Sequence, residues 1–186
     1  MSLNAQITKY PKLKQHQFKR RQLMPLTDML LWRIDAGIVR SITSDEDGNM
    51  VTLGFWGAGD IVGKPLFRVY PYQVECLTLV EASILPRAYS YPQEVLISQL
   101  QKTQELLRII HSQKIRSRLL RLLTWLAERF GNQIAEGQLI DIRLTHQELA
   151  DIISTSRVTV TRLLNQFEQE RKIGWSHSNC MILFNQ

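Results

Sequence analysis

The segment 144–169, LTHQELADIISTSRVTVTRLLNQFEQ, contains two stretches of helical periodicity separated by a short break. Thr145 is followed three residues later by Glu148, which is the pattern of a capping box and predicts the start of the first helix. The polar run 154–156 interrupts the periodicity, and Ser156 is a suitable N-cap for a second helix. The segment therefore predicts two short helices joined by a turn.

The second helix is expected to have one apolar and one polar face. Its apolar residues recur every three or four positions and predict the face that packs against the core. The other face suits the DNA major groove, because arginine can bind guanine bidentately and a Val or Thr methyl group can contact a thymine methyl. The expected base-reading residues are Arg157, Val158, Thr161 and Arg162. A surface helix with another role would also expose arginine, so the helix alone leaves that alternative open.

Polar side chains on the outer side of this segment predict contacts with DNA phosphates, and a helix N-terminus itself attracts anions. The candidates are Thr145, Ser156, Thr159 and Gln166. A preceding helix is expected from Ile115 to Phe130, with a short strand in QLIDIRL (138–144). The final stretch IGWSHSNCMILF (173–184) predicts a hairpin that turns at 176–179. Together these elements indicate a winged helix-turn-helix in a domain of residues 113–186.

Residues 30–85 have the alternating pattern of strands. LLWRIDAGIVRSI (30–42) and MVTLGFW (50–56) flank a turn-forming stretch and are expected to pair as a hairpin. YQVECLTLVEASILP (72–86) predicts one or two more strands. We therefore expect an α+β protein with an N-terminal antiparallel β-roll in a domain of residues 1–90. The basic run before the strands is interpreted as a solvated tail; its charges are Lys9, Lys12, Lys14, Lys19, Arg20 and Arg21.

The segment after Tyr91-Pro92 changes to helical periodicity and predicts a long dimerisation helix within residues 91–112. One stripe of this helix has the spacing of a coiled-coil seam and is the predicted dimer interface: Leu96, Leu100, Thr103, Leu107 and Ile110. A second apolar flank consists of Val95, Ile97, Leu106 and Ile109. A helix with two apolar faces can pack on its own domain and on a partner, which favours a symmetric homodimer. Packing on its own β-roll alone is the alternative.

The two predicted short helices, LTHQELADII and TSRVTVTRLLNQFEQ, resemble the DNA-binding domain of the Crp/Fnr transcription regulators. RVTVTRLL is nearly identical in the cyanobacterial global nitrogen regulators of that family. The resemblance continues through SRLLRLLTWLAERFG and, more faintly, through GDIVGKPLF and VEASILP. It implies a trimmed β-roll of the cyclic-nucleotide-binding type, a dimer helix and a winged helix-turn-helix. It further implies duplex DNA with a palindromic promoter site and RNA polymerase as partners, and Arg157, Val158 and Arg162 as base readers.

Two elements that hold a cyclic nucleotide in members of this family differ here. Those members have Gly-Glu after a glycine turn and an Arg-Ser/Thr-Ala element that holds the cyclic phosphate. This chain has Gly63-Lys64 and Tyr70-Pro71-Tyr72 instead, so the phosphate lacks a bidentate charge partner and the ribose lacks an acceptor. We expect no dependence on cyclic AMP and leave the effector unknown. Lys64 is a candidate for attracting another anion, with a solvated loop lysine as the alternative.

The rest of the sequence narrows the function classes. The net charge of +6 favours an anionic partner, and the lack of a long apolar run or secretory pattern predicts no membrane contact and a cytoplasmic location. The histidines and cysteines are scattered, so neither a metal site nor another cofactor is expected. An enzyme on a cupin-like roll would need histidine ligands, and residues 30–85 contain none, so no enzyme is expected. A winged helix that binds RNA or another protein stays as the alternative function.

Overall fold

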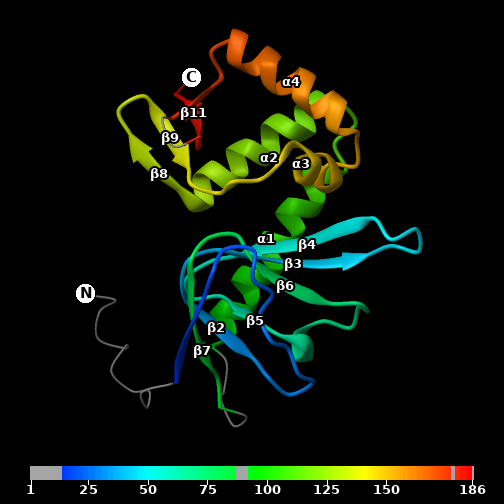
Figure 1. The fold of residues 1–186 in the computed structure, drawn as a ribbon, viewed down its shortest axis with the longest axis vertical. Helices are drawn as coiled ribbons and strands as arrows, with labels where there is room; N and C mark the ends of the chain where they lie inside the picture. Colours follow the sequence, from blue (N-terminus) through cyan, green and yellow to red (C-terminus); the bar gives the residue numbers. More distant parts are fainter. Residues whose placement is uncertain (1–13, 87–91, 177–178, 186) are drawn as a thin grey trace.

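The computed structural model describes residues 14–86, 92–176 and 179–185. Their N-terminal half forms the β-roll in the lower part of Figure 1, and the C-terminal half lies above it. The strands of the roll are β1 (Gln15–Phe18), β2 (Trp32–Ala36), β3 (Val39–Ser44), β4 (Met50–Trp56), β5 (Ile61–Val62), β6 (Gln73–Cys76) and β7 (Val80–Ile84). In the described residues they form two antiparallel sheets, with strand orders β1-β7-β2-β5 and β4-β3-β6. The expected antiparallel β-roll is confirmed.

The β3–β4 hairpin shows how local sequence sets this part of the roll. The Asp45 carboxylate accepts hydrogen bonds from the backbone N–H groups of Asp47 (3.1 Å) and Asn49 (2.8 Å), which closes the turn. The expected hairpin is confirmed, but its first arm is two strands rather than one. Gly37 adopts a φ of +85°, and a Cβ there would lie 2.2 Å from the carbonyl oxygen of Leu79. The chain therefore turns at Gly37 from one sheet into the other.

The interpretation of the basic N-terminal run as a solvated tail is wrong from Gln15 onward. β1 pairs with β7, and the buried ring of Phe18 meets that of Trp32 with centroids 5.3 Å apart. After the strand, the backbone N–H of Arg21 donates to the carbonyl oxygen of Cys76 at 2.7 Å. The β-roll therefore begins earlier than expected. Lys9 and Lys12 lie outside the described residues.

The C-terminal half follows the expected order of elements. The helices are α1 (Gln93–Ile110), α2 (Ile115–Phe130), α3 (His146–Ile152) and α4 (Arg157–Gln169), and the strands are β8 (Gly131–Ile134), β9 (Gly137–Ile140), β10 (Ile173–Trp175) and β11 (Met181–Phe184). The strands pair in the order β10-β11-β9-β8. The expected terminal hairpin is confirmed in its two strands, while residues 177–178 of its turn lie outside the described residues. β8 is an addition to the expected elements and pairs with β9.

One of the apolar clusters spans the two halves of the molecule and forms a shared core. Phe55 of β4 and the buried Leu77 belong to the same cluster as residues of α1, α2, α3 and α4. The rings of Phe55 and Trp125 of α2 meet with centroids 6.0 Å apart. Figure 1 shows α1 running from the β-roll toward α2, with α4 along the outer edge of the C-terminal half. The C-terminal half is thus packed directly on its own β-roll. None of the helices in the described part of the chain is long and apolar enough to cross a bilayer.

Candidate nucleic-acid interface

The start of α3 is fixed by a capping box, as expected from the sequence. Thr145 Oγ1 accepts a hydrogen bond from the backbone N–H of Glu148 (3.1 Å). In return, the backbone N–H of Thr145 donates to Glu148 Oε2 (2.7 Å). Both residues thereby satisfy amide groups that a helix start would leave without partners. The expected first helix of the pair is confirmed.

The start of α4 is fixed in a similar way. Ser156 Oγ accepts a hydrogen bond from the backbone N–H of Thr159 (3.2 Å), and the two hydroxyl oxygens lie 2.9 Å apart. The inner face of α4 is buried, as expected, through Val160, Leu163, Leu164 and Phe167. α4 contacts α3 along this side. The caps and the apolar face together decide which side of α4 is left open to solvent.

The open side of α4 carries the expected base-reading residues. Arg157, at the first helical position, and Arg162 are both exposed, and Val158 is 77% exposed. Within the described part of the chain, neither guanidinium has a hydrogen-bond or ion-pair partner. Isolated cations beside an exposed methyl group are the chemical features that guanine and thymine edges in a major groove can use.

Thr161 is less open than its neighbours on this face. Its hydroxyl donates to the carbonyl oxygen of Arg157 (3.0 Å) and lies 2.8 Å from Nδ1 of His146. Sequence reasoning did not link His146 to this helix, because a lone histidine carries no spacing signal. The contact ties the first turn of α3 to the second turn of α4.

The expected phosphate-binding residues fall into two groups. Thr145 and Ser156 are exposed at the starts of α3 and α4, and Thr159 is half-buried in the first turn of α4. Gln166 is half-buried and lies nine residues beyond the first residue of α4. At the rise of an α-helix this places it about 13 Å farther along the axis. The two helix starts are the natural positions for a phosphate, since their dipoles favour an anion.

Comparison with known proteins identifies the family of the domain that carries this site. Residues 117–183 match the model of the Crp-like helix-turn-helix domain. The regulatory protein CysR of Synechococcus elongatus is 41% identical over 157 residues, which cover 83% of this chain and 76% of that protein. The chain belongs to the Crp/Fnr family of transcription regulators. It is a DNA-binding transcription regulator of the Crp/Fnr type.

Further relatives agree with this membership. The global nitrogen regulator of a Nostoc species is 36% identical over 79 residues, which cover 42% of this chain and 35% of that protein. Among solved structures, a CRP-family regulator from Thermus thermophilus superposes with a TM-score of 0.78 at 24% identity, covering 91% of this chain and 92% of that one. The last likeness shows that the fold extends over nearly the whole chain.

The β-roll of this Crp/Fnr protein has a hollow where the sequence departs from cyclic-nucleotide-binding members. It has a volume of about 450 Å³ and is lined by Asp28, Lys64, Phe67, Val69, Tyr70, Pro71, Tyr72 and Gln73. Lys64 Nζ donates to Asp28 Oδ1 at 3.1 Å. Lys64 therefore has a counter-ion, and the pair lies at the surface, since the side chains of Lys64 and Asp28 are 40% and 89% exposed. The rings of Phe67 and Tyr72 stack at 4.7 Å beside it.

The expected dimer stripe of α1 is only partly open. Leu100 and Leu107 are 59% and 52% exposed, and Leu96 is also exposed. Thr103 is half-buried, and Ile110 is half-buried against the shared core. The second apolar flank faces its own protomer at Val95, Leu106 and Ile109, whereas Ile97 is exposed. One side of α1 thus packs on its own domain and another side presents leucines to solvent.

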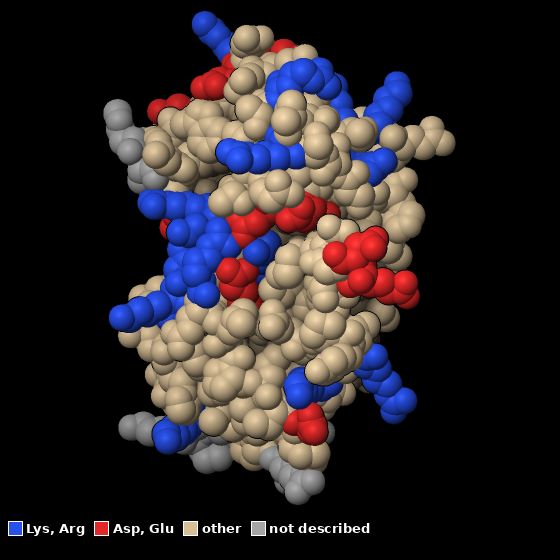
Figure 2. All heavy atoms as spheres, turned by 45° about the vertical axis from the view of Figure 1, so that its right-hand side comes forward, with Lys and Arg blue, Asp and Glu red and all other residues tan. Residues whose placement is uncertain are grey.

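A group of basic and acidic side chains beside α3 was missed by the sequence analysis. On the face shown in Figure 2, Lys and Arg side chains gather where the two halves meet, next to acidic side chains. In this region Arg20 donates to the carbonyl oxygens of Leu77 (3.2 Å) and Arg143 (2.8 Å). Arg21 and Arg40 contact Glu148. The partners lie more than 50 residues apart in the chain, so no local pattern reveals them.

Proposed function

We propose that this regulator binds a palindromic promoter site as a homodimer. The observation that carries the proposal is the open face of α4, where Arg157, Val158 and Arg162 are exposed beside two capped helix starts. A twofold dimer presents two such helices to two half-sites, which explains a palindromic target.

Within each half-site, Arg157 and Arg162 bind guanine and Val158 contacts a thymine methyl group. The Thr161 hydroxyl is already bonded within the protein, and so Thr161 contributes through its methyl group. Thr145, Ser156, Thr159 and Gln166 contact phosphates and hold the register of α4 in the groove. The exposed residues of α4 read the bases. The capped starts of α3 and α4 set how deep α4 lies in the groove.

The dimer forms along α1. Leu96, Leu100 and Leu107 are large apolar side chains that the protomer leaves exposed, with Thr103 and Ile110 completing the stripe. Burying this stripe against its symmetry mate removes apolar surface from water on both chains. The opposite side of α1 is fixed on the β-roll, so the dimer axis and the DNA-binding half are linked through one helix.

DNA binding proceeds without cyclic AMP. Lys64 is the single cation in the described lining of the β-roll hollow, and it is paired with Asp28. A cyclic phosphate entering there would have to compete with that carboxylate and would find no bidentate donor. As a promoter-bound regulator the protein acts in the cytoplasm and has RNA polymerase as a further partner.

Selection from a pool of random duplexes tests the proposal. We expect the bound sequences to converge on a palindrome with half-sites about one helical turn apart, roughly 34 Å. Enrichment of structured RNA over duplex DNA in a parallel selection would contradict it and favour an RNA-binding role. Convergence on a single non-repeated half-site would contradict the dimer.

A further inference from the structure

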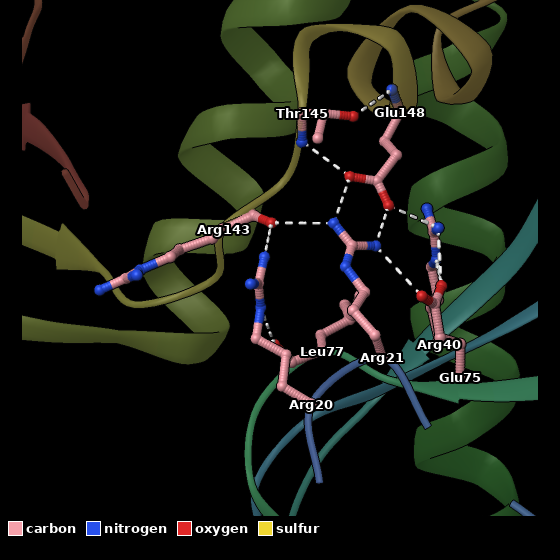
Figure 3. A network of polar contacts seen from close by, with 8 residues as sticks. All are labelled: Arg20, Arg21, Arg40, Glu75, Leu77, Arg143, Thr145 and Glu148. Atoms are coloured by element: carbon pink, nitrogen blue, oxygen red, sulfur yellow. Dashed lines mark hydrogen bonds and ion pairs between the residues drawn. The ribbon is translucent and has the colours of Figure 1, made fainter. Parts of the chain in front are cut away.

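Glu148 serves two parts of the molecule at once. Its carboxylate accepts the backbone N–H of Thr145 in the capping box of α3. The same carboxylate accepts hydrogen bonds from two arginines of the β-roll, Nη2 of Arg21 (2.8 Å, to Oε2) and Nη2 of Arg40 (2.6 Å, to Oε1). Figure 3 shows both guanidinium groups converging on the end of this side chain. The start of α3 is therefore bonded directly to the other half of the protein.

The two arginines are themselves held within the β-roll. Arg40 lies in β3, is 7% exposed, and donates through Nε to Glu75 Oε2 of β6 at 2.7 Å. Arg21 donates to Glu75 Oε1 at 3.1 Å. Arg21 also has a φ of +69°, a conformation that residues with a Cβ rarely adopt and that compensating contacts must maintain. Both cations thus reach Glu148 from fixed positions.

Fixing α3 also fixes α4. The two helices are in contact, and His146 of α3 meets the hydroxyl of Thr161 on α4. The apolar core that joins the two halves, which includes Phe55 and Leu77, holds them together through contacts without hydrogen-bond direction. Hydrogen-bonded ion pairs are directional, so the Arg21–Glu148–Arg40 group can add a preferred angle between the two halves.

We propose that Arg21 and Arg40 are positioning residues for DNA reading: acting through Glu148, they set the orientation of α3 and α4 relative to the β-roll of the same protomer. This inference rests on the proposed dimer. In such a dimer α1 and the β-roll carry the twofold axis, so the angle of each C-terminal half fixes the separation of the two α4 helices. The arginines touch no base, yet they determine which half-site spacing fits.

A spacing series tests the proposal. Fluorescence anisotropy measures the affinity of the full-length chain for its palindrome and for versions with one base pair added to or removed from the centre. We expect the wild type to prefer one spacing. R21Q lowers the affinity for that spacing about 10-fold and removes most of the preference over its neighbours. R21K restores much of it, because it keeps a cation at that position.

E148Q provides a second variant, since glutamine can also close a capping box while lacking the charge. It removes the charge that pairs with Arg40 as well as the charge that pairs with Arg21, so it should lose at least as much of the spacing preference as R21Q. The R21Q/E148Q double variant should be no worse than E148Q alone, because E148Q already lacks the Arg21–Glu148 ion pair. R33Q is the matched control. Arg33 pairs with Asp35 inside the β-roll at 2.8 Å, so R33Q loses one charge of the same half without touching α3. It should behave as the wild type.

The outcomes separate the two proposals. In one outcome the wild type prefers one spacing and folded R21Q and E148Q keep that preference. That result overturns the positioning role of the arginines and leaves the proposed binding of a palindrome by a dimer in place. If R33Q matches R21Q, general charge loss explains the effect and the positioning role is again overturned. If the wild type shows no preference for any palindrome, the proposed dimeric function fails and this inference fails with it.

Discussion

At the first position of α4, the Arg157 guanidinium has no acceptor among the described residues, and its neighbour Val158 is 77% exposed. A long charged side chain next to an exposed apolar one is poorly explained by the stability of the protomer. A base-pair edge would supply hydrogen-bond acceptors for Arg157 and an apolar contact for Val158. We therefore expect Arg157 and Val158 to take part directly in base reading.

The substitution Arg157→Ala should weaken binding to the palindrome by about 1–3 kcal/mol per half-site and relax the preference at one base pair. Competition assays with duplexes substituted at each position measure both effects. Arg68→Ala removes an exposed arginine of the β-roll and serves as the control, with little effect expected. Equal weakening on every sequence would instead make Arg157 a phosphate contact.

Glu148 gives a prediction about acid stability. Burial raises the pKa of its carboxyl, but the hydrogen bonds from Arg21 and Thr145 and the charge of Arg40 outweigh burial and lower the pKa from 4.5 to about 2. A carboxyl with a lowered folded pKa stabilises the fold above its unfolded pKa and loses that contribution as the pH falls. The free energy of unfolding should therefore decrease between pH 4.5 and pH 2.

Urea unfolding over this pH range, on the wild type and E148Q, measures that contribution. Other carboxylates also titrate there, so the difference between the two proteins isolates Glu148. E148Q should be less stable at neutral pH and show a shallower decline as the pH falls through that range. Parallel curves for the two proteins would contradict the lowered pKa of Glu148.

Some of these residues could be predicted from the sequence, and others could not. Thr145 and Glu148 cap α3 across three residues, and that spacing is a local signal. The contact between Arg21 and Glu148 joins residues 127 positions apart, and His146 meets Thr161 through the packing of two helices. Such contacts depend on the tertiary arrangement. The exposed face of α4 was therefore predictable, while the residues that orient it were not.

The helix α1 carries two different apolar sides. Leu106 and Ile109 pack inward, while Leu100 and Leu107 are exposed on another side of the same helix. Strong periodicity over 18 residues made this helix predictable. β1 was hidden because it has four residues, QHQF, with a single buried apolar residue beside a basic run. Short strands are defined by their pairing partners more than by their own pattern.

The exposed side of α1 predicts the effect of a charge in the seam. Leu100→Glu or Leu107→Glu would bury like charges across the twofold axis, which is strongly unfavourable. The variant should sediment as a folded monomer and bind the palindrome weakly, although neither residue contacts DNA. Gln101→Glu adds the same charge on another exposed side of α1 and should leave the dimer intact. A dimeric Leu100→Glu protein with unchanged affinity would place the interface elsewhere.

The β-roll is joined to the DNA-binding half by a shared core and by the Glu148 contacts. Its own hollow contains the paired Lys64 and two stacked rings. We therefore expect the β-roll to act as a support for the DNA-binding half, and DNA binding to need no cyclic AMP.

Isothermal titration calorimetry should accordingly detect no saturable binding of cyclic AMP at micromolar concentrations. The Asp28 carboxylate forms an ion pair with Lys64, and the described lining offers no second cation for the phosphate. Lys64→Ala should leave DNA affinity unchanged with or without the nucleotide. Micromolar binding that Lys64→Ala abolishes would show that the ion pair opens to receive the ligand.

The number of protein chains bound to one duplex distinguishes a dimeric reader of a palindrome from a monomer. Sedimentation velocity with the selected palindrome, and with a duplex that carries one half-site, counts the chains on each duplex without any added nucleotide. We expect two chains per palindrome and much weaker binding to the single half-site. One chain per palindrome, or equal affinity for both duplexes, would contradict it.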